Sequence, residues 1–162
     1  MRIGQGIDVH AFLEPGSANH IMLGGVEISH DRGVLAHSDG DVLIHALMDA
    51  LLGALGLPDI GHQFPDSDPK FSGANSMSLL ASVVALMDQA ALRIENLDAT
   101  VLLEAPKLVP YREAMIQSIA QALGCEQERV GLKATTTEKL GFIGRGEGIS
   151  AQVVVLLTSD PT

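Results

Sequence analysis

The stretch SDGDVLIHALMDALLGALGL, residues 38–57, joins a cluster of helix-capping residues to a long apolar run. We expect a helix with Ser38 as N-cap and Asp41 at position N3 of a capping box. Gly56 and Pro58 mark its end, because glycine favours a helix C-terminus and proline prevents the helix from continuing. The stretch therefore predicts one long and mostly apolar helix.

Apolar patterns of strand and helix type continue on both sides of this helix. A turn-rich segment separates the first two expected strands and indicates an antiparallel opening pair. Residues 59–75 contain repeated glycine and proline residues, so we expect a long loop of the kind that often closes over a site. The order β-β-α-α-β-α-β-β predicts an α+β sandwich in which helices cover one face of a sheet and leave the other exposed. The expected strands are 2–12, 20–28, 97–105, 129–136 and 149–158, and the further helices are 76–93 and 110–123.

Composition and charge limit the class of protein. At 162 residues the chain is long enough for one domain, residues 1–162, with its own core. Charged residues make up 19%, below the roughly 25% usual for soluble domains, so we expect surface to be buried against copies of the same chain. The net charge of −10 argues against nucleic acid and anionic membranes as partners, because both require a basic surface.

The single cysteine, Cys125, indicates a reducing compartment, because it can form neither an internal disulfide framework nor a zinc-thiolate cluster. The first residues lack the basic-then-apolar pattern of a signal peptide. No apolar run approaches the roughly 18 residues that span a bilayer. We therefore expect a cytoplasmic protein.

The segment GIDVH, residues 6–10, places two metal-competent side chains on the first expected strand. Residues i and i+2 of a strand point to the same face, so Asp8 and His10 would lie side by side. Together with His45 they would provide one carboxylate and two imidazoles, which leaves a fourth tetrahedral position open, as catalytic zinc requires. Asp41 or Asp49, one helical turn from His45, could accept a hydrogen bond from its other ring nitrogen.

Each of these features also has a simpler interpretation. Asp8 could cap a turn beside a solvated His10, and His45 could be a core histidine. At AHSDGD, His37 and Ser38 would lie at a helix N-terminus, which favours an anion but is also found in any capped helix. The segment KATTTEKLGFIGRGEG, residues 133–148, fits either a glycine-containing hairpin or a phosphate and divalent-cation site.

Four segments in their order along the chain resemble the 2-C-methyl-D-erythritol 2,4-cyclodiphosphate synthase family of the non-mevalonate isoprenoid pathway. They are GIDVHAF, AHSDGDVLIHALMDALLGALGLPDIGHQFPDSDP, EAPKLVPY and KATTTEKLGFIGRGEGI. The resemblance implies a metal-dependent phosphorus-oxygen lyase that cyclises 4-diphosphocytidyl-2-C-methyl-D-erythritol 2-phosphate and releases CMP. It also implies a homotrimer with active sites between subunits. The expected fold is a single-domain two-layer sandwich of the chorismate-mutase-like or ferredoxin-like type, with a mixed four-stranded sheet plus an N-terminal hairpin.

The resemblance also assigns roles to individual residues. It places one zinc ion per subunit on Asp8, His10 and His45, and a magnesium or manganese ion on Glu138 and the substrate phosphates. His37 and Thr136 are the expected catalytic residues. Substrate is expected to contact Asp8, His10, His37, Thr136 and Glu138 of this set and also the following residues: Val9, Ser38, Asp59, Ile60, Gly61, Phe64, Pro65, Asp66, Ser67, Asp68, Leu103, Glu104, Ala105, Pro106, Lys107, Leu108, Val109, Ala134, Thr135, Thr137, Phe142 and Arg145.

Within this set, the resemblance assigns separate parts of the substrate to separate segments. Residues 59–61 and 64–68 would contact the erythritol side. Residues 103–109 and 134–136 of a neighbouring subunit would form the cytidine pocket, with Lys107 near phosphate. Phe142 and Arg145 would contact substrate or line a central channel.

Three positions depart from the pattern of the family: Gln5, Ile7 and Glu104. The first two flank the expected ligands, whereas Glu104 could alter nucleotide affinity. Two other functions fit the same ligands. A zinc hydrolase would need a carboxylate base such as Asp66 or Asp68, and a non-catalytic metal-binding trimer would have a closed metal shell.

Overall fold

The computed structural model describes residues 1–65, 68 and 73–159. This part of the chain contains six strands and five α-helices, with short 3-10 helices at Val109–Tyr111 and Gln127–Arg129. The strands are β1 (Arg2–Ala11), β2 (His20–Leu23), β3 (Val26–Ser29), β4 (Leu92–Leu102), β5 (Val130–Thr135) and β6 (Gly148–Ser159). The helices are α1 (Val42–Leu55), α2 (Ile60–Gln63), α3 (Ser76–Gln89), α4 (Arg112–Leu123) and α5 (Gly141–Gly144). Their order along the chain is β1-β2-β3-α1-α2-α3-β4-α4-β5-α5-β6.

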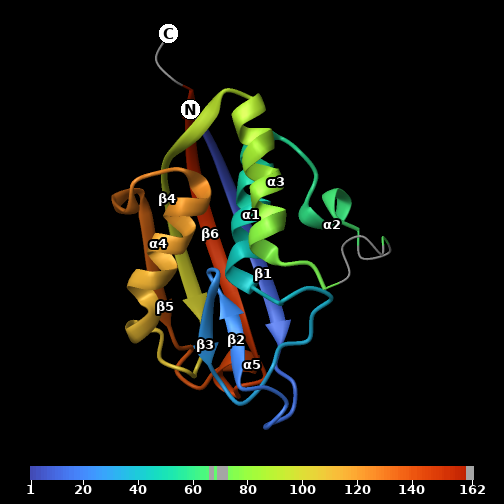
Figure 1. Ribbon diagram of the computed structural model, residues 1–162. Helices are drawn as coiled ribbons and strands as arrows, with labels where there is room; N and C mark the ends of the chain where they lie inside the picture. Colours follow the sequence, from blue (N-terminus) through green and yellow to red (C-terminus); the bar gives the residue numbers. More distant parts are fainter. Residues whose placement is uncertain (66–67, 69–72, 160–162) are drawn as a thin grey trace.

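Four strands form one mixed sheet in the order β1-β6-β4-β5. The β1–β6 and β6–β4 pairs are antiparallel and the β4–β5 pair is parallel. Helices α1, α3 and α4 lie over one face of this sheet, and the β2–β3 hairpin lies beside the start of α1 (Figure 1). The architecture is therefore the expected α+β arrangement of a mixed sheet covered by helices.

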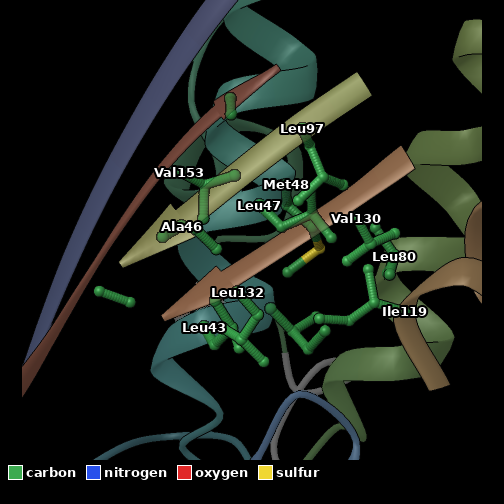
Figure 2. Packing of buried hydrophobic residues seen from close by; sticks show 14 of the residues in the cluster. Leu43, Ala46, Leu47, Met48, Leu80, Leu97, Ile119, Val130, Leu132 and Val153 are labelled. Carbon is green, nitrogen blue, oxygen red and sulfur yellow. The ribbon is translucent and has the colours of Figure 1, made fainter. Parts of the chain in front are cut away.

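Alternation along the strands separates a buried face from an open one. In β4, residues Leu97, Ala99 and Val101 point into the core, where side chains from α1, α3 and α4 meet those of the sheet (Figure 2). On the opposite face the side chains of Ile3 and Ile7 stay 72% and 52% exposed. The structure thus confirms the exposed sheet face expected from the sequence.

Two glycines bring β1 unusually close to α1. A Cβ atom on Gly4 would lie 1.9 Å from the backbone oxygen of Ala50, and one on Gly6 would lie 2.0 Å from that of Ala46. No side chain fits at those distances, so only glycine permits this backbone approach. The approach matters for the site, because Asp8 and His10 follow these glycines on β1 and His45 precedes Ala46 on α1.

Several sequence-based expectations about the elements are wrong. The segment 20–28 does not pair with β1 but folds into its own hairpin, with Gly24 and Gly25 at the turn in the left-handed region. The partner of β1 is β6. The N-cap of α1 is Asp41 rather than Ser38, and its carboxylate accepts the N–H of Ile44, so the helix begins three residues later than expected.

The later elements agree with the expectations only in part. Helix α4 ends at Gly124 in a left-handed conformation, as expected. Strand β4 begins at Leu92, where a continued helix was expected. The segment 133–148 is not a hairpin, because β4 lies between β5 and β6 in the sheet. Within the described residues, no helix combines the length and apolar character needed to cross a membrane.

Candidate metal centre and substrate site

Asp8, His10 and His45 converge on one point between β1 and α1, and we call them the metal triad. The Oδ2 atom of Asp8 lies 3.1 Å from Nε2 of His10 and 3.0 Å from Nδ1 of His45. The two ring nitrogens lie 3.2 Å apart. One donor atom from each side chain therefore stands at a corner of a nearly equilateral triangle.

This triangle fits one face of a tetrahedral metal site. Ligand atoms at about 2.0–2.1 Å from a tetrahedrally coordinated ion are about 3.3 Å apart, close to the observed separations. Two imidazoles and one carboxylate leave a fourth position open, which is the arrangement of catalytic rather than structural zinc sites. The donor set therefore supports a metal ion, as the sequence predicted.

The three side chains of the metal triad interact electrostatically with one another. Burial raises the pKa of Asp8, but the close contacts and charges of the His10 and His45 rings outweigh that effect and hold the pKa of Asp8 well below its usual range. Burial lowers the pKa of His10, whereas the hydrogen bond to Asp8 raises it, with a net increase. The site thus favours an ionised carboxylate, which is the form that binds metal.

The second nitrogen of His45 does not contact Asp41 or Asp49, contrary to expectation. Its Nε2 atom lies 2.9 Å from Oγ of Ser76 and 3.2 Å from Oγ of Ser38. The two aspartates expected as partners accept backbone hydrogen bonds instead. Asp41 accepts the N–H groups of Gly24, Gly25 and Ile44. Asp49 accepts the N–H of Ile60. Ser76 was not among the expected site residues, because it is distant in the sequence and lies in a pattern that predicts only the start of a helix.

A cavity of about 270 Å³ adjoins the metal triad. Its lining contains the metal triad and several of the residues expected to bind diphosphate and erythritol. The remaining lining residues are Leu35, Ala36, His37, Ser38, Met48, Ile60, Gly61, Phe64 and Leu79. Of these, Leu35, Ala36, Met48 and Leu79 were not among the expected site residues.

Three described residues expected on the erythritol side, Asp59, Pro65 and Asp68, do not line this cavity, and neither does Val9. Asp59 is the N-cap of α2 and lies 2.8 Å from Nδ1 of His62. Val9 is exposed on the opposite face of β1. Pro65 and Asp68 are described but do not line the cavity, whereas Asp66 and Ser67 lie outside the described residues.

The loop before α1 differs from the expected anion site. The carboxylate of Asp41 already accepts an N–H of the first turn of α1. An anion would therefore meet the loop at His37 and Ser38 rather than a bare helix N-terminus. His37 and Ser38 therefore remain candidate contacts for an anion, but the helix dipole is not the main interaction that would favour the anion there.

A second cavity, of about 220 Å³, lies at the opposite edge of the sheet, beside β5 and α4. Its lining contains most of the residues expected around cytidine and adds Arg112, Met115, Leu132 and Lys133. The expected members are Leu103, Glu104, Pro106, Lys107, Leu108, Val109, Ala134, Thr135 and Thr136. Ala105 and Thr137 lie in the same segments without lining the cavity.

Glu104 organises the turn that follows β5. Its Oε1 atom accepts the N–H groups of Thr137 and Lys139 at 3.3 and 3.4 Å, and its Oε2 atom lies 2.6 Å from Nζ of Lys139. Glu138 and Lys139 both have positive φ angles, 51° and 66°, which are unfavourable for residues with side chains. Thr136 donates its hydroxyl to Oε1 of Glu138 at 2.9 Å. The residue that departs from the family pattern thus supports the backbone of the expected Glu138 cation site.

The last two expected residues lie after this turn. Phe142 is 41% exposed. Arg145 forms an ion pair with Glu147 at 2.7 Å, so its charge is already partly balanced within the chain. Neither residue lines either of the two cavities.

The two cavities do not merge within one chain. In the register of the sheet, His10 at the end of β1 pairs with Ile149 of β6. Leu102 at the end of β4 pairs with the next residue of β6, Ser150, and on its other side with Thr135 of β5. Three strand spacings of about 4.8 Å separate β1 from β5, or about 14 Å in all. Strands β1 and β5 form the two edges of the sheet (Figure 1). The cavities beside them therefore lie at the same end of the sheet but at its opposite edges.

Comparison with known proteins assigns the chain to a family. The model of the YgbB family matches residues 1–158. A relative from Alcanivorax borkumensis named 2-C-methyl-D-erythritol 2,4-cyclodiphosphate synthase is 58% identical over 159 residues, which is 98% of each chain. A structure titled "Structure of the Bifunctional IspDF from Campylobacter jejuni" superposes with a TM-score of 0.90 at 46% identity, over 96% of this chain and 42% of the bifunctional one. A structure titled "IspF (Plasmodium falciparum) CDP complex" gives a TM-score of 0.86 at 35% identity, covering 99% of this chain and 97% of the other. The chain therefore belongs to the YgbB family, together with relatives named 2-C-methyl-D-erythritol 2,4-cyclodiphosphate synthase.

Proposed function

We propose that the chain is an enzyme of isoprenoid biosynthesis that converts 4-diphosphocytidyl-2-C-methyl-D-erythritol 2-phosphate to 2-C-methyl-D-erythritol 2,4-cyclodiphosphate and CMP. The observation that carries this function is the metal triad beside a cavity lined by His37 and Ser38, in a chain of this family. The full length of the chain, residues 1–162, would act as one catalytic domain, and its single cysteine fits a cytoplasmic location.

The metal triad would hold one zinc ion per subunit. When bound, the ion would supply a Lewis acid that withdraws charge from phosphate oxygens. Oδ2 of Asp8, Nε2 of His10 and Nδ1 of His45 are the proposed ligand atoms, because these atoms face one another. Glu138 would hold a magnesium or manganese ion together with the substrate phosphates, since both ions favour oxygen ligands.

The reaction needs positioning more than acid-base chemistry. The 2-phosphate oxygen attacks the β-phosphorus of the same molecule, and CMP leaves with the bridging oxygen. Since nucleophile and electrophile belong to one substrate, the main task is to fold that substrate. A phosphate is already ionised at neutral pH, so the proposed contacts of His37, Ser38 and Thr136 would orient and stabilise the phosphates.

The active site would be completed by a neighbouring copy of the chain. The cavity beside β5 would take the cytidine, with Lys107 near phosphate, and the cavity at the metal triad would take the erythritol and diphosphate. Because these cavities lie at opposite edges of the sheet, the β5 edge of one subunit would meet the β1 edge of the next. Repeated head-to-tail contact of this kind forms a ring when the rotation between subunits closes, and we propose a closed homotrimer.

Phosphorus NMR of the purified protein with its diphosphocytidyl substrate and magnesium tests this function. We expect CMP and the cyclic diphosphate to appear together. The variant His45→Ala should abolish both signals, whereas His20→Ala, which removes an exposed histidine from the hairpin, should change neither. Linear phosphate products would instead identify a hydrolase. Binding of CDP without any turnover would identify a non-catalytic trimer.

A further inference from the structure

Ser76 connects the metal triad to a carboxylate that the expected mechanism does not use. It is the first residue of α3 and is completely buried. Its Oγ atom lies 2.9 Å from Nε2 of His45 and donates a hydrogen bond to Oδ1 of Asp39. The backbone N–H of Ser76 donates to Oδ2 of the same carboxylate at 2.9 Å. Both oxygens of Asp39 are therefore directed at Ser76.

The order of these contacts determines the direction of each hydrogen bond. An ionised carboxylate can only accept, so the single hydroxyl hydrogen of Ser76 is directed to Asp39. The oxygen of Ser76 can then only accept from His45, which requires the hydrogen of the imidazole to be on Nε2. In a neutral imidazole the lone pair is then on Nδ1, the atom that faces Asp8 and His10.

We propose that Asp39 and Ser76 are positioning residues that fix the hydrogen of His45 on Nε2 and so keep Nδ1 available to a metal ion. This inference rests on the proposed metal site. Hydrogen bonding of a metal-ligating histidine through its second nitrogen orients the ring and strengthens the ligand. Ser38 lies further from Nε2, at 3.2 Å, and also accepts the N–H of Gly40, so it is the weaker partner.

Backbone hydrogen bonds also join the residues just before Ser76 to the segment around Asp39. The N–H of Asp39 donates to the carbonyl of Ala74 at 3.3 Å, and the N–H of Gly73 donates to that of His37 at 2.9 Å. The loop that leads into α3 is thereby attached to the loop that carries His37 and Ser38. Ser76 therefore holds its position through backbone contacts as well as through its hydroxyl group.

The variant Ser76→Ala tests the inference by titration with Zn²⁺ alone against a chromophoric chelator. We expect Zn²⁺ affinity to fall about 10- to 100-fold, the effect usual for loss of such a partner. Ser82→Ala, on the exposed side of the same helix, should leave the affinity unchanged. Unchanged affinity in Ser76→Ala would overturn the inference, whereas absence of Zn²⁺ binding in the unaltered protein would instead overturn the proposed metal site.

The variant Asp39→Asn tests the direction of the hydrogen bonds without removing a side chain. The new amide would use its oxygen for the backbone N–H of Ser76 and turn its NH₂ group toward Oγ. The hydroxyl hydrogen would then point at Nε2 of His45, which favours the wrong tautomer, as in the Ser-His-Asp triad when its aspartate becomes asparagine. In the Zn²⁺-loaded unaltered protein, proton NMR should show a slowly exchanging Nε2 hydrogen on His45. Asp39→Asn should lose this signal and bind Zn²⁺ at least about tenfold more weakly, and retention of both properties would overturn the inference.

Discussion

Replacing Gly6 by alanine should damage the metal site without changing any ligand. The new Cβ would lie 2.0 Å from the backbone oxygen of Ala46, about 1.4 Å closer than the 3.4 Å at which ordinary contact begins. Neither backbone can rotate away, so β1 and α1 must separate by a comparable distance. Asp8 and His10 lie on β1 and His45 on α1, so their donor atoms would move from 3.0–3.2 Å to about 4.5 Å apart.

That separation is too large for a shared ion. Two donors at about 2.05 Å from one metal ion cannot be more than about 4.1 Å apart. We therefore expect Gly6→Ala to lower Zn²⁺ affinity at least about 100-fold, more than the loss of a supporting hydrogen bond. Overpacking of this kind should also cost about 1–3 kcal/mol in the free energy of unfolding.

Gly53→Ala provides the matched control at the same interface. Its Cβ would meet only the carbonyl oxygen of Gln5, at 3.8 Å, which is ordinary contact. Alanine is also the better helix former, so this variant should gain about 0.5–1 kcal/mol in the free energy of unfolding and retain Zn²⁺ binding. Chelator competition and urea denaturation measure the two quantities. Zn²⁺ affinity in Gly6→Ala within threefold of the unaltered protein would refute the reasoning.

Further predictions concern the cap of α1, the turn after β5, the half-buried histidine His30 and the metal itself. Asp41→Ala should lower the free energy of unfolding by about 3 kcal/mol in urea denaturation, because three backbone N–H groups lose their acceptor; an effect below 1 kcal/mol would contradict this reading. Glu104→Ala should weaken CDP binding about tenfold in calorimetry and leave Zn²⁺ affinity unchanged, because it releases the positive-φ turn but not the metal triad. Burial lowers the pKa of His30 from 6.5, so its contribution to stability is present above pH 6.5 and is lost as the pH falls through the lowered pKa. His30→Phe should therefore reduce the fall in unfolding temperature between neutral and mildly acidic pH, and an unchanged slope would contradict this assignment. Chelation should lower the unfolding temperature and added Zn²⁺ should restore it, because an ion bound only by the folded chain stabilises that state.

The local part of the metal site could be predicted from the sequence. The two-residue spacing of Asp8 and His10 places both on one face of a strand whatever its partner is. His45 stands out because a lone imidazole on a buried apolar helix needs a polar partner. These arguments depend only on the periodicity of strands and helices, and the structure brings the three side chains together as expected.

Contacts between distant segments could not be predicted in the same way. Alternation shows which face of β1 is buried but not which strand pairs with it. The sequence therefore favours the nearest segment, 20–28, whereas the structure pairs β1 with β6. Ser76 was missed for a related reason, since a serine at a helix start ordinarily satisfies its own helix end. Its contact with His45 depends on how α3 packs against α1, and a local sequence pattern does not predict that packing.

The order of the strands also argues for an assembly as the functional unit. Neither central strand, β6 or β4, contributes a lining residue to either cavity within the described part of the chain. On the proposed function, the two cavities would therefore be separate half-sites, one beside each edge strand. Ile3 and Ile7 remain exposed on the open face beside the β1 edge, where burial against a second copy would remove apolar surface from water. Head-to-tail contact between β1 and β5 edges would complete a site and bury that face in the same step. On this proposal, a chain prevented from associating should still bind Zn²⁺ but should not cyclise its substrate.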